Sequence, residues 1–288
     1  MDKKKVNIKM AVFGSLASIG ILIISQIMSQ LIGYLFDLFG MPGYIGGFVS
    51  AIIYPIFTYL GLKLLIERRM KIPLDTLRIK KFKIKPICAV MAVCLPTIVV
   101  LSYLCLKGTW TESKMTTDEK ITTIVYGVLF YSVAAGIVEE MVFRGIIMGL
   151  IEKSISVTSA VAAPSVLFGL MHIIGNHLNF LSIIQLVIGG TAVGIMFSLI
   201  ELYSENLWNN ALVHALWNMS TVGLMHIGTQ PCSESVFTYV LKSRSILVTG
   251  GDFGIETSVI SIIAYLLVIA VTLVLLSRKE KTNNIEVV

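Results

Sequence analysis

Two adjacent glutamates and an arginine interrupt an otherwise apolar stretch of the chain, in the run EEMVFR that begins at Glu139 and ends at Arg144. On a helix, Glu140 and Arg144 share one face with the acid on the N-terminal side, which favours a bidentate ion pair that keeps Glu140 ionised. Glu139 lies about 100° around the helix and has no basic partner at helical spacing. The run therefore indicates either a carboxylate for general acid–base catalysis or a structural salt-bridge cluster.

Two histidines occur in later apolar segments. His172 ends the run FGLMH that begins at Phe168, and His214 begins the run HALWN that ends at Asn218. An imidazole can activate water, and His214 and Asn218 would project from one helix face as donors to a developing oxyanion. Each histidine also fits a structural interpretation, as a hydrogen-bonded packing residue or a polar contact between packed helices.

These polar groups can meet if their helices cross the same membrane. Ionisable residues within spans are costly and mark functional sites by default. The helical rise places Glu139 about 18 Å from the inner end of its segment and His172 about 22 Å from the inner end of the next one. His214 lies about 10 Å above the start of its own segment. We therefore expect Glu139, His172, His214 and Asn218 to converge on one intramembrane cavity.

Two chemistries stay open for such a cavity. In a hydrolytic site, Glu139 would activate water with His172, while His214 and Asn218 would receive the oxyanion. In a metal site, Glu139, His172 and His214 would hold zinc and leave one position for water. The sequence lacks the zinc-protease run HExxH, the nucleophile-elbow run GxSxG and a phosphate-binding glycine loop, so these three kinds of site are excluded.

The composition determines which elements must position these groups. The chain of 288 residues is 56% apolar and 14% charged, and its mean hydropathy is +0.85. A soluble domain carries about a quarter charged residues and a disordered chain has low hydrophobicity, so both classes are excluded. The composition predicts an all-α, polytopic membrane protein. About eight transmembrane helices are expected, at approximately residues 8–36, 44–66, 87–106, 121–150, 157–174, 181–200, 207–227 and 253–276.

The basic residues predict the orientation of these spans. With both termini cytoplasmic, 18 of the 23 Lys and Arg residues lie on the inner side and five on the outer side. This is a strong positive-inside pattern. It accounts for the net charge of +6 without a polyanionic partner, and no recognition motif for nucleic acid accompanies the charge. The four cysteines show neither a disulfide framework nor a metal-ligand spacing.

Several smaller features also carry expectations. Gly190 and Gly194 are four residues apart in an apolar segment, which predicts close helix packing. Glu201 and Glu205 fall in a predicted inner loop, so we expect both to be solvated. His226 is expected near the outer end of the seventh span, as an interfacial residue.

The runs Glu-Glu-x-x-x-Arg, Phe-x-x-x-His and His-x-x-x-Asn, in this order, resemble those of the CAAX protease and bacteriocin-processing (CPBP or Abi) family of intramembrane proteases. The resemblance covers about residues 120–225. It implies an eight-helix membrane fold with a cavity open toward the cytoplasm. In the roles that it implies, Glu139 is the base and His172 helps to activate water. His214 and Asn218 form the oxyanion site. It also implies three supporting residues: Glu140, Arg144 and Phe168.

The resemblance implies a hydrolase, an intramembrane endopeptidase that cleaves a membrane-associated peptide or protein. Its role would be CAAX-type processing, bacteriocin or signal-peptide maturation, or self-immunity. The family includes metalloproteases and glutamate proteases. We prefer a mechanism without a cofactor, because the amide of Asn218 occupies the position at which a third strong zinc ligand would be expected. Zinc bound by Glu139, His172 and His214 is the alternative.

Two other functions were weighed against proteolysis. A non-catalytic immunity or scaffold membrane protein could share the fold, because a fold does not determine a function. The intact set of four polar residues counts against it. A transporter with ion-binding carboxylates would show internal repeats and broken helices, and neither is visible in the sequence.

The chain is expected to divide into three parts. Residues 1–119 hold the N-terminal spans and a basic cytoplasmic loop, residues 120–227 form the catalytic core, and residues 228–288 contain an outer loop, the last span and a cytoplasmic tail. We expect a multi-pass protein of a bacterial plasma membrane, with its active site toward the cytoplasmic side. The lipid bilayer and a peptide or protein substrate are the expected partners, and the sequence gives no oligomeric state.

Overall fold

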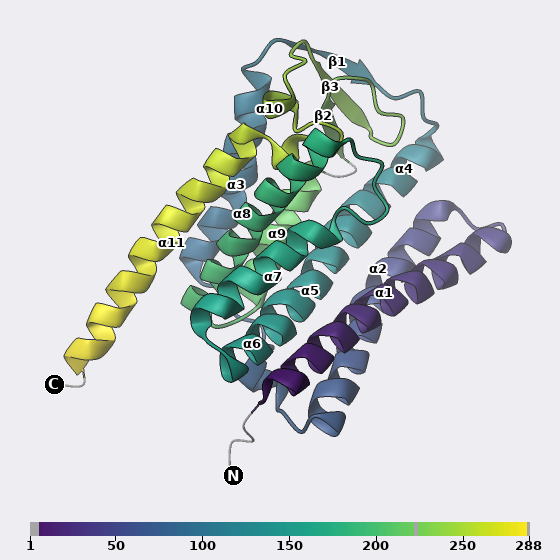
Figure 1. Ribbon diagram of the computed structural model, residues 1–288. Coiled ribbons are helices and arrows are strands. Elements are labelled where there is room, and N and C mark those ends of the chain that lie inside the picture. Colours follow the sequence, from purple (N-terminus) through teal and green to yellow (C-terminus); the bar gives the residue numbers. More distant parts are fainter. Residues whose placement is uncertain (1–5, 222–223, 287–288) are drawn as a thin grey trace.

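A bundle of long helices with a small sheet at one end makes up residues 6–221 and 224–286, which the computed structural model describes. The first helix begins and the last helix ends at the opposite end of the bundle from the sheet (Figure 1). Six helices in these ranges are long and apolar enough to cross a membrane: Ile8–Leu38, Gly43–Arg69, Pro86–Leu104, Thr117–Ser154, Phe180–Ser204 and Val259–Thr282.

The protein is therefore a mostly helical, multi-pass membrane protein. Two further helices of the bundle are shorter: α7 (Val157–Met171) is apolar, and α9 (Trp208–Thr221) has 14 residues. The count of eight spans and the orientation of the termini stay predictions. The other α-helices are α1 (Ile8–Leu38), α2 (Gly43–Lys63), α3 (Pro86–Leu104), α4 (Thr117–Val125), α5 (Ala135–Glu140), α6 (Met148–Ser154), α8 (Phe180–Ser204), α10 (Ile246–Thr249) and α11 (Val259–Glu286).

The segment Thr117–Ser154 is one long helix built from α- and π-helical parts. The π-helical segments η3 (Tyr126–Ala134) and η4 (Met141–Ile147) join α4, α5 and α6. A third π-helical segment, η1 (Leu64–Arg69), extends α2. Short π-helical stretches occur frequently at functional sites, and η3 and η4 lie on either side of α5, which ends in the two glutamates. The 3₁₀ turns are η2 (Leu74–Leu77) and η5 (Ile255–Thr257).

The turns before two of the cavity helices are fixed by side-chain caps. The carbonyl oxygen of the Asn179 side chain accepts a hydrogen bond from the backbone N–H of Ser182 and starts α8. The Ser156 hydroxyl accepts one from the backbone N–H of Ser159 and starts α7. Such caps satisfy N–H groups that the first turn of a helix leaves without partners. They define where α7 and α8 begin.

The sheet is a feature that the all-helical prediction did not contain. It has the order β1-β3-β2, with β1 (Gly108–Glu112) antiparallel and β2 (Met225–Gly228) parallel to β3 (Phe237–Leu241). The predicted span 207–227 was too long, because α9 ends at Thr221 and His226 lies in β2. The predicted last span also began too early, because α11 starts at Val259.

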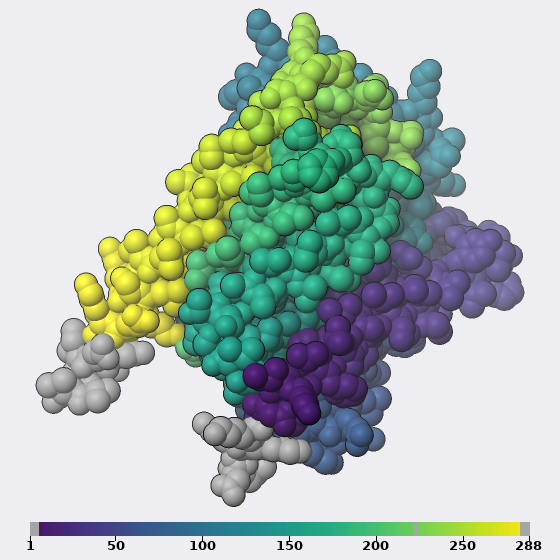
Figure 2. Space-filling model, viewed as in Figure 1, coloured from purple at the N-terminus to yellow at the C-terminus, as the bar shows by residue number. Residues whose placement is uncertain are grey.

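The outer surface of the bundle is apolar, as a lipid-facing surface requires. Leu16 and Ile24 of α1 are 66% and 63% exposed, and Leu267 of α11 is 57% exposed. Figure 2 shows one face of the molecule, where the teal segment that includes α7 forms the surface between α1 and α11. The buried side of α1 instead consists of small residues: Ala11, Gly14, Ser18, Ser25, Ser29 and Gly33. Small residues let membrane helices approach closely.

Candidate functional site

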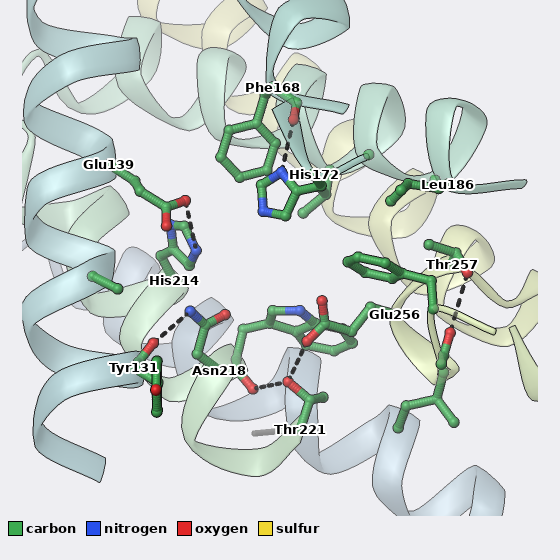
Figure 3. A pocket seen from close by; sticks show the side chains of 18 of the residues that line it. Tyr131, Glu139, Phe168, His172, Leu186, His214, Asn218, Thr221, Glu256 and Thr257 are labelled. Atoms are coloured by element: carbon green, nitrogen blue, oxygen red, sulfur yellow. Dashed lines mark hydrogen bonds and ion pairs between the residues drawn. The ribbon is translucent and has the colours of Figure 1, made fainter. Parts of the chain in front are cut away.

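A cavity of about 570 Å³ lies within the bundle. Glu139, Phe168, His172, His214 and Asn218 all line it, and Figure 3 shows them around one space. They come from the long helix, from α7 and the residue that caps its C-terminus, and from α9. The structure therefore brings together the residues that the sequence expected to converge. Their chemical roles stay predictions.

A glycine lets the two glutamates approach α9. A Cβ atom added to Gly136 would lie 3.1 Å from the backbone nitrogen of Ala215, so α5 and α9 are nearly in backbone contact there. Glu139 and Glu140 follow Gly136 by one helical turn, and His214 directly precedes Ala215. The close contact therefore sets the glutamates beside the imidazole of His214.

His214 lies between the two glutamates. Its Nδ1 donates a hydrogen bond to Oε1 of Glu140 over 3.0 Å, and its Nε2 lies 3.9 Å from Oε2 of Glu139. The sequence showed no basic partner for Glu139 along its own helix, and the structure supplies one from α9. Glu139 remains 21% exposed to the cavity, whereas Glu140 is fully buried. Glu140 thus orients the imidazole, and Glu139 faces the cavity.

Arg144 neutralises Glu140 from one turn further along the helix. Its Nη1 donates to Oε1 of Glu140 over 3.0 Å, and both side chains are fully buried. The contact uses one carboxylate oxygen, so the expected bidentate geometry was wrong. The second terminal nitrogen of the guanidinium group, Nη2, donates a hydrogen bond to the backbone oxygen of Gly194 over 3.3 Å. The guanidinium carbon also lies 4.6 Å from the ring centre of Phe168 and 5.0 Å from that of Phe197.

Phe168 touches both histidines of the cavity. Its ring centre lies 4.5 Å from that of His172 and 6.0 Å from that of His214. The Phe168 backbone oxygen accepts a hydrogen bond of 2.7 Å from Nδ1 of His172. Because a carbonyl can only accept, Nδ1 carries the proton and Nε2 of the neutral ring is an acceptor. His172 therefore presents a basic nitrogen.

The expected close packing at Gly190 and Gly194 is confirmed. A Cβ atom added to Gly190 would lie 2.6 Å from Cα of Gly169, and one added to Gly194 would lie 2.7 Å from Cα of Ser165. These glycines are on α8, and their neighbours are on α7. The contact fixes the position of α7, and hence of His172 at its end.

Asn218 follows His214 by one turn of α9. Its amide nitrogen Nδ2 donates to the backbone oxygen of Tyr131 over 3.0 Å. An amide nitrogen has two hydrogens, so one donor position is left after this bond. Figure 3 shows Asn218 beside His214 on the rim of the same cavity.

One prediction about the surroundings of the site was wrong. Glu201 was expected to be solvated in a loop, but α8 continues to Ser204 and Glu201 is fully buried. Its Oε2 accepts a hydrogen bond of 2.9 Å from Nδ2 of Asn210, and the same amide group donates to the backbone oxygen of Phe197. Asn210 lies one turn before His214 on α9. The spacing of Asn210, His214 and Asn218 along one helix face was the signal that could have indicated this contact.

Other polar residues reach the cavity from segments that carry no recognised motif. Glu256 lies in η5, and its Oε1 accepts a hydrogen bond of 2.6 Å from the hydroxyl of Thr221. His226 lines the cavity from β2, and burial lowers the pKa of its imidazole. The sequence predicted no role in the cavity for either residue, because His226 was expected at the membrane interface and Glu256 belongs to no recognised motif.

The cavity extends toward the sheet end of the molecule. Its lining runs from Tyr54 in the middle of α2 to Asn176 after α7, His226 in β2 and Phe253 before η5. In Figure 1 the sheet and these connections lie opposite the start of α1 and the end of α11. Cytoplasmic access was expected together with cytoplasmic termini. The lining lies toward the end of the bundle opposite the start of α1 and the end of α11, and both expectations stay predictions.

The expected zinc ligands do not form a metal-binding group in this geometry. Within the described ranges, no three His, Cys, Asp or Glu side chains lie close enough to hold a metal ion. We therefore derive no step through a metal.

Comparison with known proteins gives one match. Residues 121–220 match the family model described as type II CAAX prenyl endopeptidase Rce1-like. No curated protein and no solved structure matches the chain significantly. The matched segment runs from the long helix to α9 and includes Glu139, His172, His214 and Asn218. Residues 121–220 are thus similar to the type II CAAX prenyl endopeptidase Rce1-like family, and the resemblance inferred from the spaced motifs is confirmed.

Proposed function

We propose that the protein is an intramembrane endopeptidase that cleaves a membrane-associated peptide or protein. The observation that carries this proposal is the convergence of Glu139, His172, His214 and Asn218 on one cavity inside a membrane bundle. The Rce1-like match over residues 121–220 supports the same chemistry. We take residues 120–227 as the catalytic core.

In the first step, the Glu139 carboxylate accepts a proton from a water molecule in the cavity. The water oxygen attacks the carbonyl carbon of the peptide bond. His172 orients this water through Nε2, the acceptor left free when Nδ1 donates to Phe168. Glu139 suits the task because it is the more exposed carboxylate of the pair and Arg144 does not neutralise it directly.

In the second step, the tetrahedral oxyanion accepts hydrogen bonds from His214 and Asn218. As an imidazolium, His214 donates from Nδ1 to Glu140 and from Nε2 to the oxyanion. Asn218 donates through the amide hydrogen that Tyr131 does not use. The carbon–nitrogen bond then breaks, and Glu139 returns its proton to the leaving amine. One water is consumed, and a carboxyl group and an amine are formed.

The orientation bears on the class of substrate. We propose a bacterial plasma-membrane protein with cytoplasmic termini, supported by the 18 of 23 basic residues that this orientation places inside. The sheet end then faces outward. The cavity lining at that end supports access from the non-cytoplasmic side, in place of the cytoplasmic access that the sequence predicted. This favours maturation of an exported bacteriocin or signal peptide over processing of a cytoplasmic CAAX protein.

The proposal is tested with purified protein in liposomes and a set of membrane-anchored peptides. Glu139→Gln and His172→Ala should each lower the cleavage rate at least about 100-fold, which is typical of lost acid–base catalysis. Glu112→Gln is the matched control, because Glu112 is exposed on β1 outside the cavity. Cleavage by both cavity variants at the wild-type rate would contradict the assignment. A wild-type protein that cleaves none of the peptides would favour the non-catalytic immunity or scaffold alternative.

We propose further that hydrolysis needs no metal ion. The support is the amide of Asn218 at the place where a third strong ligand would help zinc. A chelator should leave the cleavage rate of the same preparation unchanged. Loss of activity with the chelator, restored by added zinc, would overturn this part of the proposal.

A further inference from the structure

A second carboxylate faces the cavity from the side opposite Glu139. Glu256 lines the cavity from η5, and Figure 3 shows it across the space from Glu139. The mechanism above does not use it. Glu256 also lies outside the matched segment 121–220.

The position of Glu256 is fixed before any substrate binds. The hydroxyl of Tyr265, a fully buried residue, donates to the backbone oxygen of Glu256 over 2.9 Å. The Thr221 hydroxyl donates a hydrogen bond to Oε1 of the side chain over 2.6 Å. No described residue donates a hydrogen bond to Oε2. Glu256 therefore offers one oriented carboxylate oxygen to the cavity.

Among the described residues, the lining of the cavity includes Glu139 and Glu256 but no Lys or Arg side chain to pair with the Glu256 carboxylate. Aromatic side chains line the same cavity as Glu256. Trp217 and Tyr265 line the cavity with their ring centres 5.3 Å apart, and Phe253 belongs to the same lining. An acidic group among aromatic faces suits a cationic ligand, since both attract positive charge.

We propose that Glu256 is a specificity-determining residue that binds a positively charged side chain, Lys or Arg, of the peptide substrate. This inference rests on the proposed endopeptidase function and concerns the same cavity. A bound cation fills the open position at Oε2. Glu139 at the far side of the cavity can then act on a peptide bond at a fixed distance from that side chain.

The test uses sets of membrane-anchored peptides that are identical except for Lys, Gln or Glu at one scanned position. At one position the wild-type protein should cleave the Lys peptide with the highest kcat/KM. Glu256→Gln should lower kcat/KM for the Lys peptide about 10- to 100-fold, the loss expected for a hydrogen bond to a charged group, and should change the Gln peptide little. Glu256→Lys should prefer the Glu peptide. Glu112→Gln, on the exposed face of β1, should behave as the wild type.

A binding measurement separates this inference from the proposed function. Binding of the fluorescently labelled peptides to the Glu139→Gln protein should show the same Lys preference, and the added Glu256→Gln change should remove it. If the wild type cleaves nothing while Lys-selective binding remains, the endopeptidase proposal fails and the role of Glu256 stands. If the three peptides bind equally, if none binds, or if Glu256→Gln keeps the Lys preference, the inference is overturned.

Discussion

His214 connects a buried ion pair with an open cavity. On one side it contacts Glu140, which Arg144 neutralises, and on the other it faces Glu139. Glu140 and Arg144 are both fully buried, so each depends on the other for charge compensation. The pair also holds the imidazole in one orientation. The buried pair of Glu140 and Arg144 therefore determines where the imidazole of His214 points.

Arg144→Met should destabilise the protein by about 3–5 kcal/mol, because it leaves the Glu140 carboxylate buried without its counter-charge. Thermal or denaturant unfolding in detergent measures this loss. The double variant Glu140→Gln with Arg144→Met should recover most of the stability, since no buried charge remains without compensation. It should not recover cleavage, because His214 loses its carboxylate. Unchanged stability of the single variant would show that the ion pair contributes little.

The members of the site could be predicted, but their pairing could not. Glu139, His172 and His214 stand out because ionisable residues are scarce in apolar segments. The spacing along one helix revealed the contact of Glu140 with Arg144. It could not reveal the contact of either glutamate with His214, because that distance depends on how two helices pack. Glu256 fell at the start of the predicted span 253–276 but matched no motif, and only the fold shows that it lies in η5 and lines the cavity.

At the scale of elements, helix contacts made by glycine control the distances in the site. Gly136 brings the long helix against α9, and Gly190 brings α8 against α7. The first contact places Glu139 beside His214, and the second determines where α7 holds His172. Apolar segments were sufficient to predict most helices to within a few residues. The strands were missed because they have only four or five residues each and show no long alternating pattern.

Gly190→Ala should lower the free energy of unfolding by about 1–3 kcal/mol, because the new methyl group would overlap Gly169 on α7. The cleavage rate should fall by about 100-fold if His172 moves by about 1 Å. This loss is larger than the loss of folded protein alone would cause. Unfolding curves and cleavage rates of the same preparation check both effects. Gly20→Ala in α1 is the control, because a Cβ there has no neighbour within 4 Å. If the two variants behave alike, close packing of α7 on α8 does not position His172.

At the scale of the whole molecule, the two ends of the bundle differ in charge. The loop between α2 and α3 is rich in Lys and Arg and lies at the end where α1 starts and α11 finishes. The sheet end carries the few remaining basic residues and the loops that line the cavity. In the orientation that we propose, with both termini in the cytoplasm, the sheet end and the cavity lining near it face outward.

Cys232, in the connection between β2 and β3, provides a direct test of this orientation. The test uses cells that express a variant in which Cys88, Cys94 and Cys105 are replaced by alanine, so that Cys232 is the one cysteine left. A membrane-impermeant maleimide added to these cells should label Cys232 from outside. A second variant lacks all four cysteines and carries Lys81→Cys, which places a thiol in the exposed basic loop. This thiol should react with the maleimide only after the membrane is permeabilised. The reverse pattern would place the sheet end in the cytoplasm. It would restore cytoplasmic access to the cavity, and with it the processing of a cytoplasmic substrate.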